Sequence, residues 1–319
     1  MDENSSELLH DFSPLLKVHK DGRVERPLGN RFVPASIDAE TGVRSKDVQI
    51  LSDPNLIARL YLPKNAVVSA KKLPLLVYIH GGGFVIGSPF SPLYHKYLNL
   101  LVSESNVVAV SLEYRLAPEH PLPIAYDDVW MAFKWVASQS KNNENSEEWL
   151  KNYADFDRVY IGGDSAGGNI AHNLAIRVGS EKLEDVNIRG LYLNSPYFWG
   201  KDPDGEEAKN YINLWNFKTN DIWLYVCPGS KGWDDPWANP GMDSKLSSIG
   251  CRKVLYYVGE KDVLKDRGVL YKEALEKSGW NGDIEIVEVE GEYHCFNVFS
   301  PDTKNSKIML KKVASFLNY

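Results

Sequence analysis

The sequence predicts an α/β fold in which helices cover both faces of a mostly parallel central sheet. Continuous apolar runs, which are typical of strands buried on both faces, recur at 75–79, 107–112, 159–161, 191–193 and 254–258. Stretches with the helical spacing of apolar residues alternate with these runs, at 93–104, 125–139, 166–178, 266–278 and 306–317. Strand and helix therefore alternate along the chain, and right-handed crossovers are expected.

Three further segments are expected to be extended without being buried on both faces. Residues 20–23 indicate a turn between two short extended pieces within residues 1–30, which we expect to form a cap or strap. Residues 57–62 alternate roughly, as expected of an outer strand with one wetter face. Residues 284–289 alternate like an edge strand.

Residues 196–245 interrupt the alternation of strand and helix, and we expect them to form a cap over the site. The segment is rich in glycine, proline and aspartate, and it contains Trp199, Trp215, Trp223, Trp233 and Trp237. Such aromatic density favours a small satellite core, one edge of which can also line a pocket. The expected organisation is one domain over residues 1–319, with cap elements at about 1–30 and 196–245.

Charge and cysteine content restrict the function further. A net charge of -7 without a basic run argues against a nucleic-acid partner. The apolar stretches are of strand length and the first seven residues are acidic, so no membrane segment or secretory signal is expected. The three cysteines Cys227, Cys251 and Cys295 are an odd number at unrelated spacings, which favours a reducing compartment and hence the cytoplasm. No metal or cofactor fingerprint is present, and none is expected.

Two motifs indicate the chemistry. Residues 163–167 read Gly-Asp-Ser-Ala-Gly, a G-x-S-x-G pattern between an expected strand and an expected helix, which exposes the hydroxyl of Ser165 on a sharp turn. By itself this pattern also occurs by chance in unrelated loops. Residues 80–84 read His-Gly-Gly-Gly-Phe and again follow an apolar run. The two motifs together predict a serine hydrolase.

The remaining catalytic candidates follow Ser165 in the chain order acid, then histidine, that this motif requires. Asp262 lies in the loop after the run 254–258, and His294 lies in the loop after 284–289. His294 would take the proton of the serine, and Asp262 would fix the tautomer of the imidazole. Glu260 and Asp266 compete with Asp262, but Glu260 is nearer the end of the strand and Asp266 falls on the next helix. The other histidines considered lie on cap, helix or loop segments: His10, His19, His95, His120 and His172. Cys295 beside His294 is a poor candidate nucleophile when Ser165 is present.

The glycine-rich loop at 80–84 is expected to stabilise an oxyanion. Negative charge on a carbonyl oxygen needs preplaced donors, and the backbone N–H groups of Gly82, Gly83 and Ala166 fit that task. Phosphate binding is the alternative for such a loop. It fails because neither Lys-Ser nor Lys-Thr follows, and no G-x-G-x-x-G precedes a helix there.

With these motifs in hand, the chain resembles the hormone-sensitive-lipase-like branch of the α/β-hydrolases, and within it a plant carboxylesterase. The resemblance runs from about Leu16 to the C-terminus. It rests on residues 80–84, 114–120 and 163–169 and on the loops of Asp262 and His294. Residues 20–26, 278–280 and 314–317 resemble the subgroup that includes 2-hydroxyisoflavanone dehydratases.

The resemblance implies several possible activities. The subgroup contains esterases, dehydratases that form no acyl-enzyme, cyclases and, further off, a hormone receptor. Receptors and cyclases of this kind tend to lose members of the serine, acid and histidine set, which is intact here. Dehydratases often carry threonine at the nucleophile and alanine in the glycine loop, whereas this chain has Ser165 and three glycines.

The sequence therefore predicts a serine carboxylesterase that acts on small carboxylic esters, such as specialised plant metabolites, through an acyl-enzyme on Ser165. Elimination or cyclisation at the same site, with or without ester cleavage and loss of carbon dioxide, is the alternative, and a small-molecule receptor is a third. A monomer or homodimer is expected.

Overall fold

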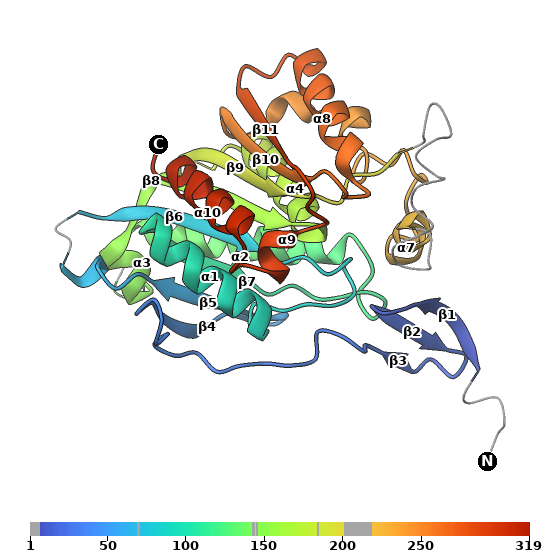
Figure 1. The fold of residues 1–319 in the computed structure, drawn as a ribbon, viewed down its shortest axis with the longest axis horizontal. Coiled ribbons are helices and arrows are strands. Elements are labelled where there is room, and N and C mark those ends of the chain that lie inside the picture. The colour runs from blue at the N-terminus through green and yellow to red at the C-terminus, as the bar shows by residue number, and fades with distance from the viewer. Residues whose placement is uncertain (1–6, 69–70, 142–143, 145, 184, 201–218) are drawn as a thin grey trace.

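The structure, a computed structural model, describes residues 7–68, 71–141, 144, 146–183, 185–200 and 219–319 (Figure 1). Its centre is an eight-stranded sheet in the order β11-β10-β9-β8-β6-β7-β5-β4. Pairing is parallel from β11 to β7, and β5 pairs antiparallel with both β7 and β4. The strands are β4 (Arg44–Ser52), β5 (Asn55–Leu62), β6 (Leu73–Ile79), β7 (Val108–Leu112), β8 (Ala154–Asp164), β9 (Ile188–Asn194), β10 (Lys253–Gly259) and β11 (Asp283–Val289).

Helices cover both faces of this sheet. In Figure 1, α1 and α10 lie in front of the strands, and α2 and α4 lie behind them. The helices are α1 (Pro92–Ser105), α2 (Ile124–Ser138), α3 (Glu148–Tyr153), α4 (Ala166–Glu181), α7 (Thr219–Val226), α8 (Lys265–Ser278), α9 (Phe296–Phe299) and α10 (Lys304–Leu317). Strand and helix alternate through the parallel part of the sheet, as the sequence predicted.

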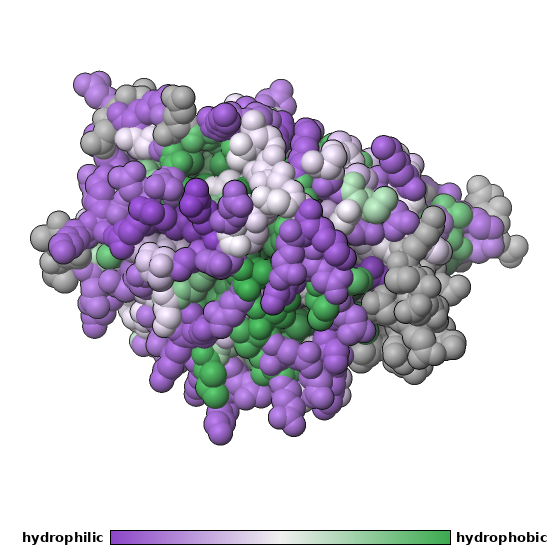
Figure 2. Space-filling model, turned by 90° about the horizontal axis from the view of Figure 1, so that it is seen from above, coloured by the Kyte–Doolittle hydropathy of each residue, from purple (hydrophilic) through white to green (hydrophobic). Residues whose placement is uncertain are grey.

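Two apolar clusters, one on each face, hold these layers together. Every residue of β6 is buried. Val77 belongs to the cluster that includes Phe133 of α2 and Ile170 of α4, whereas Leu76 belongs to the cluster that includes Leu101 of α1. Because neighbouring residues of a strand face opposite sides, a strand between two helical layers must be apolar at every position. From above, polar side chains cover most of the surface, and apolar ones gather in a band near its middle (Figure 2).

A second, small sheet precedes the main one. It is antiparallel and consists of β1 (Leu8–Phe12), β2 (Leu16–His19) and β3 (Val24–Glu25). The turn expected at 20–23 separates β2 from β3. The small sheet contacts α7, because the rings of His10 and Phe12 lie 4.8 and 5.0 Å from the ring of Tyr225. The two segments expected to form a cap therefore touch each other.

One prediction from the sequence is wrong, and another falls partly outside the described residues. Residues 57–62 are not the outer strand, because β4 pairs along β5 and leaves most of β5 buried. The sequence did not predict β4, whose residues Arg44–Ser52 are mostly polar and partly exposed and carry no clear apolar pattern. β11 lies at the other edge, as expected. Of the predicted cap segment 196–245, residues 201–218, including Trp215, lie outside the described residues.

In the described part of the chain, no helix combines the length and apolarity needed to span a bilayer.

Candidate active site

The site is built at the end of β8, where the chain turns sharply into α4. Ser165 occupies this turn with φ of 50° and ψ of -120°, a backbone conformation that residues with a side chain rarely adopt. The turn lies against neighbouring backbone. A Cβ on Gly163 would lie 2.4 Å from the carbonyl oxygen of Gly167, and a Cβ on Gly167 would lie 2.1 Å from that of Ile79. Both glycines of the motif are therefore required by close packing of β8, α4 and β6.

The residue between Gly163 and Ser165 fastens this turn to the glycine-rich loop. Asp164 is buried, and its carboxylate accepts hydrogen bonds from the hydroxyls of Tyr78 and Tyr94, both at 2.8 Å, and from the N–H of Gly81 at 3.2 Å. Burial raises the pKa of Asp164 to about 6, although these hydrogen bonds favour the charged form. This network connects β6, α1, the loop at Gly81 and the turn at Ser165.

Ser165, His294 and Asp262 come together, because the carboxyl ends of β8, β10 and β11 share one edge of the sheet. Gly259 at the end of β10 is paired with Val289 at the end of β11. The Oγ of Ser165 lies 2.9 Å from Nε2 of His294, and Nδ1 of His294 lies 2.9 Å from Oδ2 of Asp262. This chain of contacts has the geometry by which a histidine removes a proton from a serine while a carboxylate orients the ring.

Burial and charge shift the pKa values of His294 and Asp262 in opposite directions. Burial lowers the pKa of His294, but attraction to the Asp262 carboxylate outweighs it and leaves the pKa well above the ordinary value. Burial also raises the pKa of Asp262, and attraction to His294, with a hydrogen bond from the N–H of Leu264 at 2.9 Å, brings that pKa below its ordinary value. The Asp262 side chain is fully buried, whereas that of His294 is 24% exposed and can reach a substrate.

The competing residues lie elsewhere. The exposed Glu260 accepts a hydrogen bond from the N–H of Gly291, and Asp266 is exposed in the first turn of α8. His172 is buried in α4 against the hydroxyl of Tyr271. Burial raises the pKa of the Cys295 thiol to about 11, which keeps it protonated and a poor nucleophile.

The expected oxyanion donors lie beside Ser165. Gly82 and Gly83 both have positive φ, at 122° and 62°, and Gly82 leaves no space for a side chain because a Cβ would lie 2.1 Å from the carbonyl oxygen of Ile86. Ala166 is the first residue of α4. Within the described residues, the N–H groups of Gly82, Gly83 and Ala166 donate to no acceptor. They are available to a ligand.

A cavity of about 580 Å³ is lined by Gly82, Gly83, Ser165 and His294. Its walls are mainly apolar and come from the N-terminal segment, the glycine loop, α1, α7 and the loops after β10 and β11. They include Leu15, Leu28, Ile86, Ile222 and Phe299. The sequence alone did not predict Tyr78 or Tyr94 as site residues. The only sequence signal was for Tyr78, which lies in the apolar run before the glycine-rich loop.

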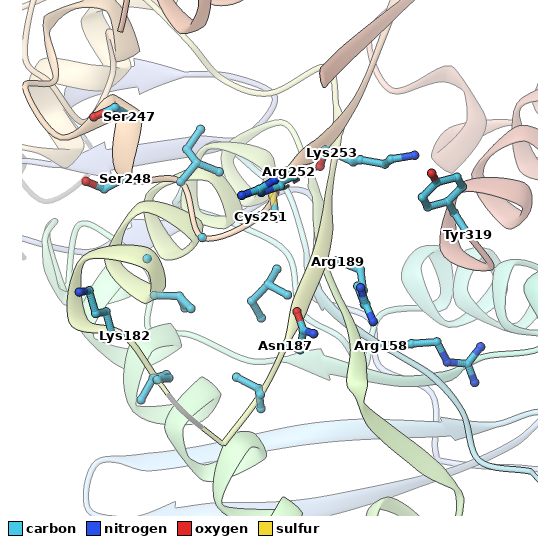
Figure 3. A pocket seen from close by; sticks show the side chains of 17 residues that line it. Arg158, Lys182, Asn187, Arg189, Ser247, Ser248, Cys251, Arg252, Lys253 and Tyr319 are labelled. Carbon is cyan, nitrogen blue, oxygen red and sulfur yellow. Dashed lines mark hydrogen bonds between the residues drawn. The ribbon is translucent and has the colours of Figure 1, made fainter. Parts of the chain in front are cut away.

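A larger hollow of about 990 Å³ lies at the amino ends of the strands, opposite the ends that carry Ser165 (Figure 3). Arg158, Arg189 and Lys253 line it, and they lie near the beginnings of the buried runs in β8, β9 and β10, away from Ser165. It contains none of the predicted catalytic residues, so volume alone does not identify the active site.

Comparisons with known proteins agree with this architecture. A family model described as alpha/beta hydrolase fold matches residues 76–298, and one of the carboxylesterase family matches residues 30–119. A solved esterase from Pyrobaculum calidifontis is 30% identical with a TM-score of 0.69, over 86% of this chain and 84% of that one. A thermostable carboxylesterase cloned from a metagenomic library is 28% identical with a TM-score of 0.69, over 89% and 90%. The chain therefore belongs to the α/β-hydrolase family.

Among curated relatives, the chain is similar to plant proteins over nearly its full length. It is 48% identical to a 2-hydroxyisoflavanone dehydratase from Glycyrrhiza echinata, over 98% of this chain and 97% of that protein. It is 44% identical to probable carboxylesterase 3 from Arabidopsis thaliana, over 95% and 96%. The predicted fold and family resemblance are confirmed. The carboxylesterase relatives and the esterase structures support a carboxylic ester hydrolase.

Replacing Gly167 with alanine should destabilise the protein. The added Cβ would meet the carbonyl oxygens of Ile79 and His80 at 2.1 and 2.4 Å, so backbone must shift. We expect a loss of about 2 kcal/mol or more in the free energy of unfolding, measured by urea denaturation. Gly229→Ala is the matched control, because a Cβ there meets nothing within 4 Å. Equal stability of the two variants would contradict the packing argument.

Asp262→Asn should change the pH dependence of activity as well as its size. If His294 accepts the proton of Ser165, it must be neutral to do so, and activity should rise as pH passes the pKa of His294. The Asp262 charge raises that pKa, and its removal should move the acid limb of kcat/KM to lower pH. The rate should fall on the order of 10⁴-fold. Both are measured with p-nitrophenyl butyrate, with the exposed Glu260→Gln as control. An unmoved limb would show that Asp262 does not act on His294.

Proposed function

We propose that Ser165, His294 and Asp262 form a catalytic triad, and that the protein hydrolyses small carboxylic esters through an acyl-enzyme on Ser165. The observation that carries the proposal is the pair of 2.9 Å contacts that joins Ser165 to His294 and His294 to Asp262. Only a serine whose hydroxyl touches a base is a useful nucleophile at neutral pH.

In the first half of the reaction, Nε2 of His294 takes the proton of Ser165 while Oγ attacks the ester carbonyl. Asp262 keeps the proton on Nδ1 and stabilises the imidazolium that forms. When the tetrahedral intermediate collapses, the bond between the carbonyl carbon and the alkoxy oxygen breaks, and the imidazolium gives its proton to that oxygen, which departs as the alcohol. The product of this half is an ester between the acyl group and Ser165.

Water completes the reaction by the same route. His294 removes a proton from the water, which attacks the acyl carbonyl, and then returns a proton to Ser165 as the carboxylic acid departs. In both halves the negative carbonyl oxygen accepts hydrogen bonds from the N–H groups of Gly82, Gly83 and Ala166. Each such donor contributes on the order of 10²-fold to 10³-fold in rate.

The substrate is proposed to be a small ester with a largely apolar body, such as a specialised plant metabolite. Support comes from the volume and apolar walls of the cavity. We propose that residues 1–30 and 196–245 cap this cavity within a single domain, since Leu15 and Ile222 both contribute to its lining. The cytoplasmic location and the monomer or homodimer stay predictions from the sequence.

Dehydration is the second candidate, because a relative 48% identical to this chain is named a 2-hydroxyisoflavanone dehydratase. In that reaction His294 and the oxyanion donors would serve an elimination, and Ser165 would form no bond to the substrate. Ser165 and the three glycines of the loop favour hydrolysis.

The change Ser165→Ala distinguishes the two candidates. Hydrolysis of p-nitrophenyl acetate and butyrate should fall on the order of 10⁴-fold or more, because the bond that forms the acyl-enzyme is lost. The exposed Ser52→Ala serves as the control and should keep full activity. If hydrolysis survived Ser165→Ala within a few-fold, the acyl-enzyme would be wrong.

A dehydratase predicts a different pattern with a 2-hydroxyisoflavanone as substrate. His294→Ala would abolish elimination, whereas Ser165→Ala would keep a sizeable part of it. Measuring both variants on both substrate types therefore assigns the reaction.

A further inference from the structure

One lining residue of the catalytic cavity has no part in the mechanism above. Arg31 is the only lysine or arginine among the residues that line the cavity in the described part of the chain. The other ionisable groups expected to be charged there are already engaged, since Asp164 binds two tyrosine hydroxyls and His294 binds Asp262. Arg31 is therefore the charge in this cavity that remains available to a ligand.

Among the described residues, no carboxylate forms an ion pair with Arg31. Arg31 also makes no side-chain hydrogen bond with any residue that the structure describes. Other arginines that border the same N-terminal region are paired, such as Arg26 with Glu119. An exposed arginine without a partner among the described residues is commonly only solvated, whereas Arg31 lies at the wall of the catalytic cavity.

Hydrogen bonds tie the chain down on both sides of Arg31. Upstream, the guanidinium of Arg26 donates to Glu119, with Nη1 to Oε1 at 2.9 Å. Downstream, the N–H of Val33 donates to the carbonyl oxygen of Phe90 at 2.9 Å. The short segment between these two contacts runs along the cavity, and residues 27–31 all line it. Arg31 is thus held at the cavity instead of lying on a free arm.

The rest of the cavity would bind apolar groups. Leu15, Ile86, Val263 and Phe299 contribute to its walls. A ligand that fills it therefore needs an apolar body, an ester carbonyl within reach of Ser165 and an anionic group for Arg31. A guanidinium binds a carboxylate through two parallel hydrogen bonds, which adds geometric selectivity to charge.

We propose that Arg31 is a specificity-determining residue that binds a carboxylate on the substrate, so that the preferred substrates are acidic esters with an apolar body. The proposal rests on the proposed ester hydrolysis for its catalytic readout. It adds a substrate class, since a neutral ester of the same length would use the apolar walls but leave Arg31 unpaired.

The test compares two esters of equal chain length, the mono-p-nitrophenyl ester of suberic acid and p-nitrophenyl octanoate. A long diacid is chosen because the free carboxylate of a short one attacks its own ester. Arg31→Gln should lower kcat/KM for the suberate ester about fivefold, mainly through KM, and leave that for octanoate within about twofold. Arg31→Lys, which keeps the charge, should retain most of the preference.

Two controls separate recognition from a general effect of charge. Arg44→Gln removes an exposed arginine of β4 that does not line the cavity, and it should leave the ratio of the two kcat/KM values unchanged. Raising the ionic strength should reduce the preference of the wild type for the suberate ester but not affect the Arg31→Gln protein.

A binding measurement keeps this test independent of turnover. Calorimetry with Ser165→Ala should show that adding Arg31→Gln weakens binding of the suberate ester about fivefold and leaves binding of the octanoate ester unchanged. Equal binding and an equal kcat/KM ratio with and without Arg31 would overturn the proposal, even if both esters are hydrolysed. Loss of suberate binding in a protein that hydrolyses neither ester would support Arg31 and contradict the esterase.

Discussion

The backbone of α4 passes so close to the end of β6 that no side chain fits between them, and the site depends on this contact. At Gly167 a Cβ would lie 2.1 Å from the carbonyl oxygen of Ile79. The contact brings the first turn of α4 against the carbonyl oxygen of His80, at the start of the glycine-rich loop, and Ser165 just before α4 has a positive φ of 50°. Asp164 stabilises this contact, because its buried carboxylate accepts hydrogen bonds from the hydroxyls of Tyr78 and Tyr94.

The electrostatics of the site follow from that geometry. A buried carboxylate is costly unless it is hydrogen-bonded or paired, and the two acids here are satisfied in different ways. Asp164 is held by neutral hydroxyls, and its pKa rises to about 6. Asp262 faces His294, and its pKa falls below the ordinary value while that of His294 rises. One acid therefore supports the frame, and the other supplies the charge proposed to orient the base.

Much of the fold was predictable, because strands such as β6, buried on both faces, must be apolar at every position. Polar β4 gave no such signal. Ser165, Asp262 and His294 were predictable as a set, since strands of a parallel sheet end at one edge and the chain order is known for this kind of turn. Their roles stay predictions. Tyr94 and Arg31 could not be found in this way, because only tertiary packing brings Tyr94, 70 residues away in sequence, to Asp164.

The catalytic role proposed for Ser165 is best tested by mass spectrometry after reaction with an organophosphonate ester, which traps a serine that is activated by a neighbouring base. We predict a single adduct on the peptide that contains Ser165. The adduct should be absent from Ser165→Ala and form much more slowly in His294→Ala. An adduct on another residue, or no adduct in a protein that still hydrolyses p-nitrophenyl esters, would contradict a catalytic role for Ser165.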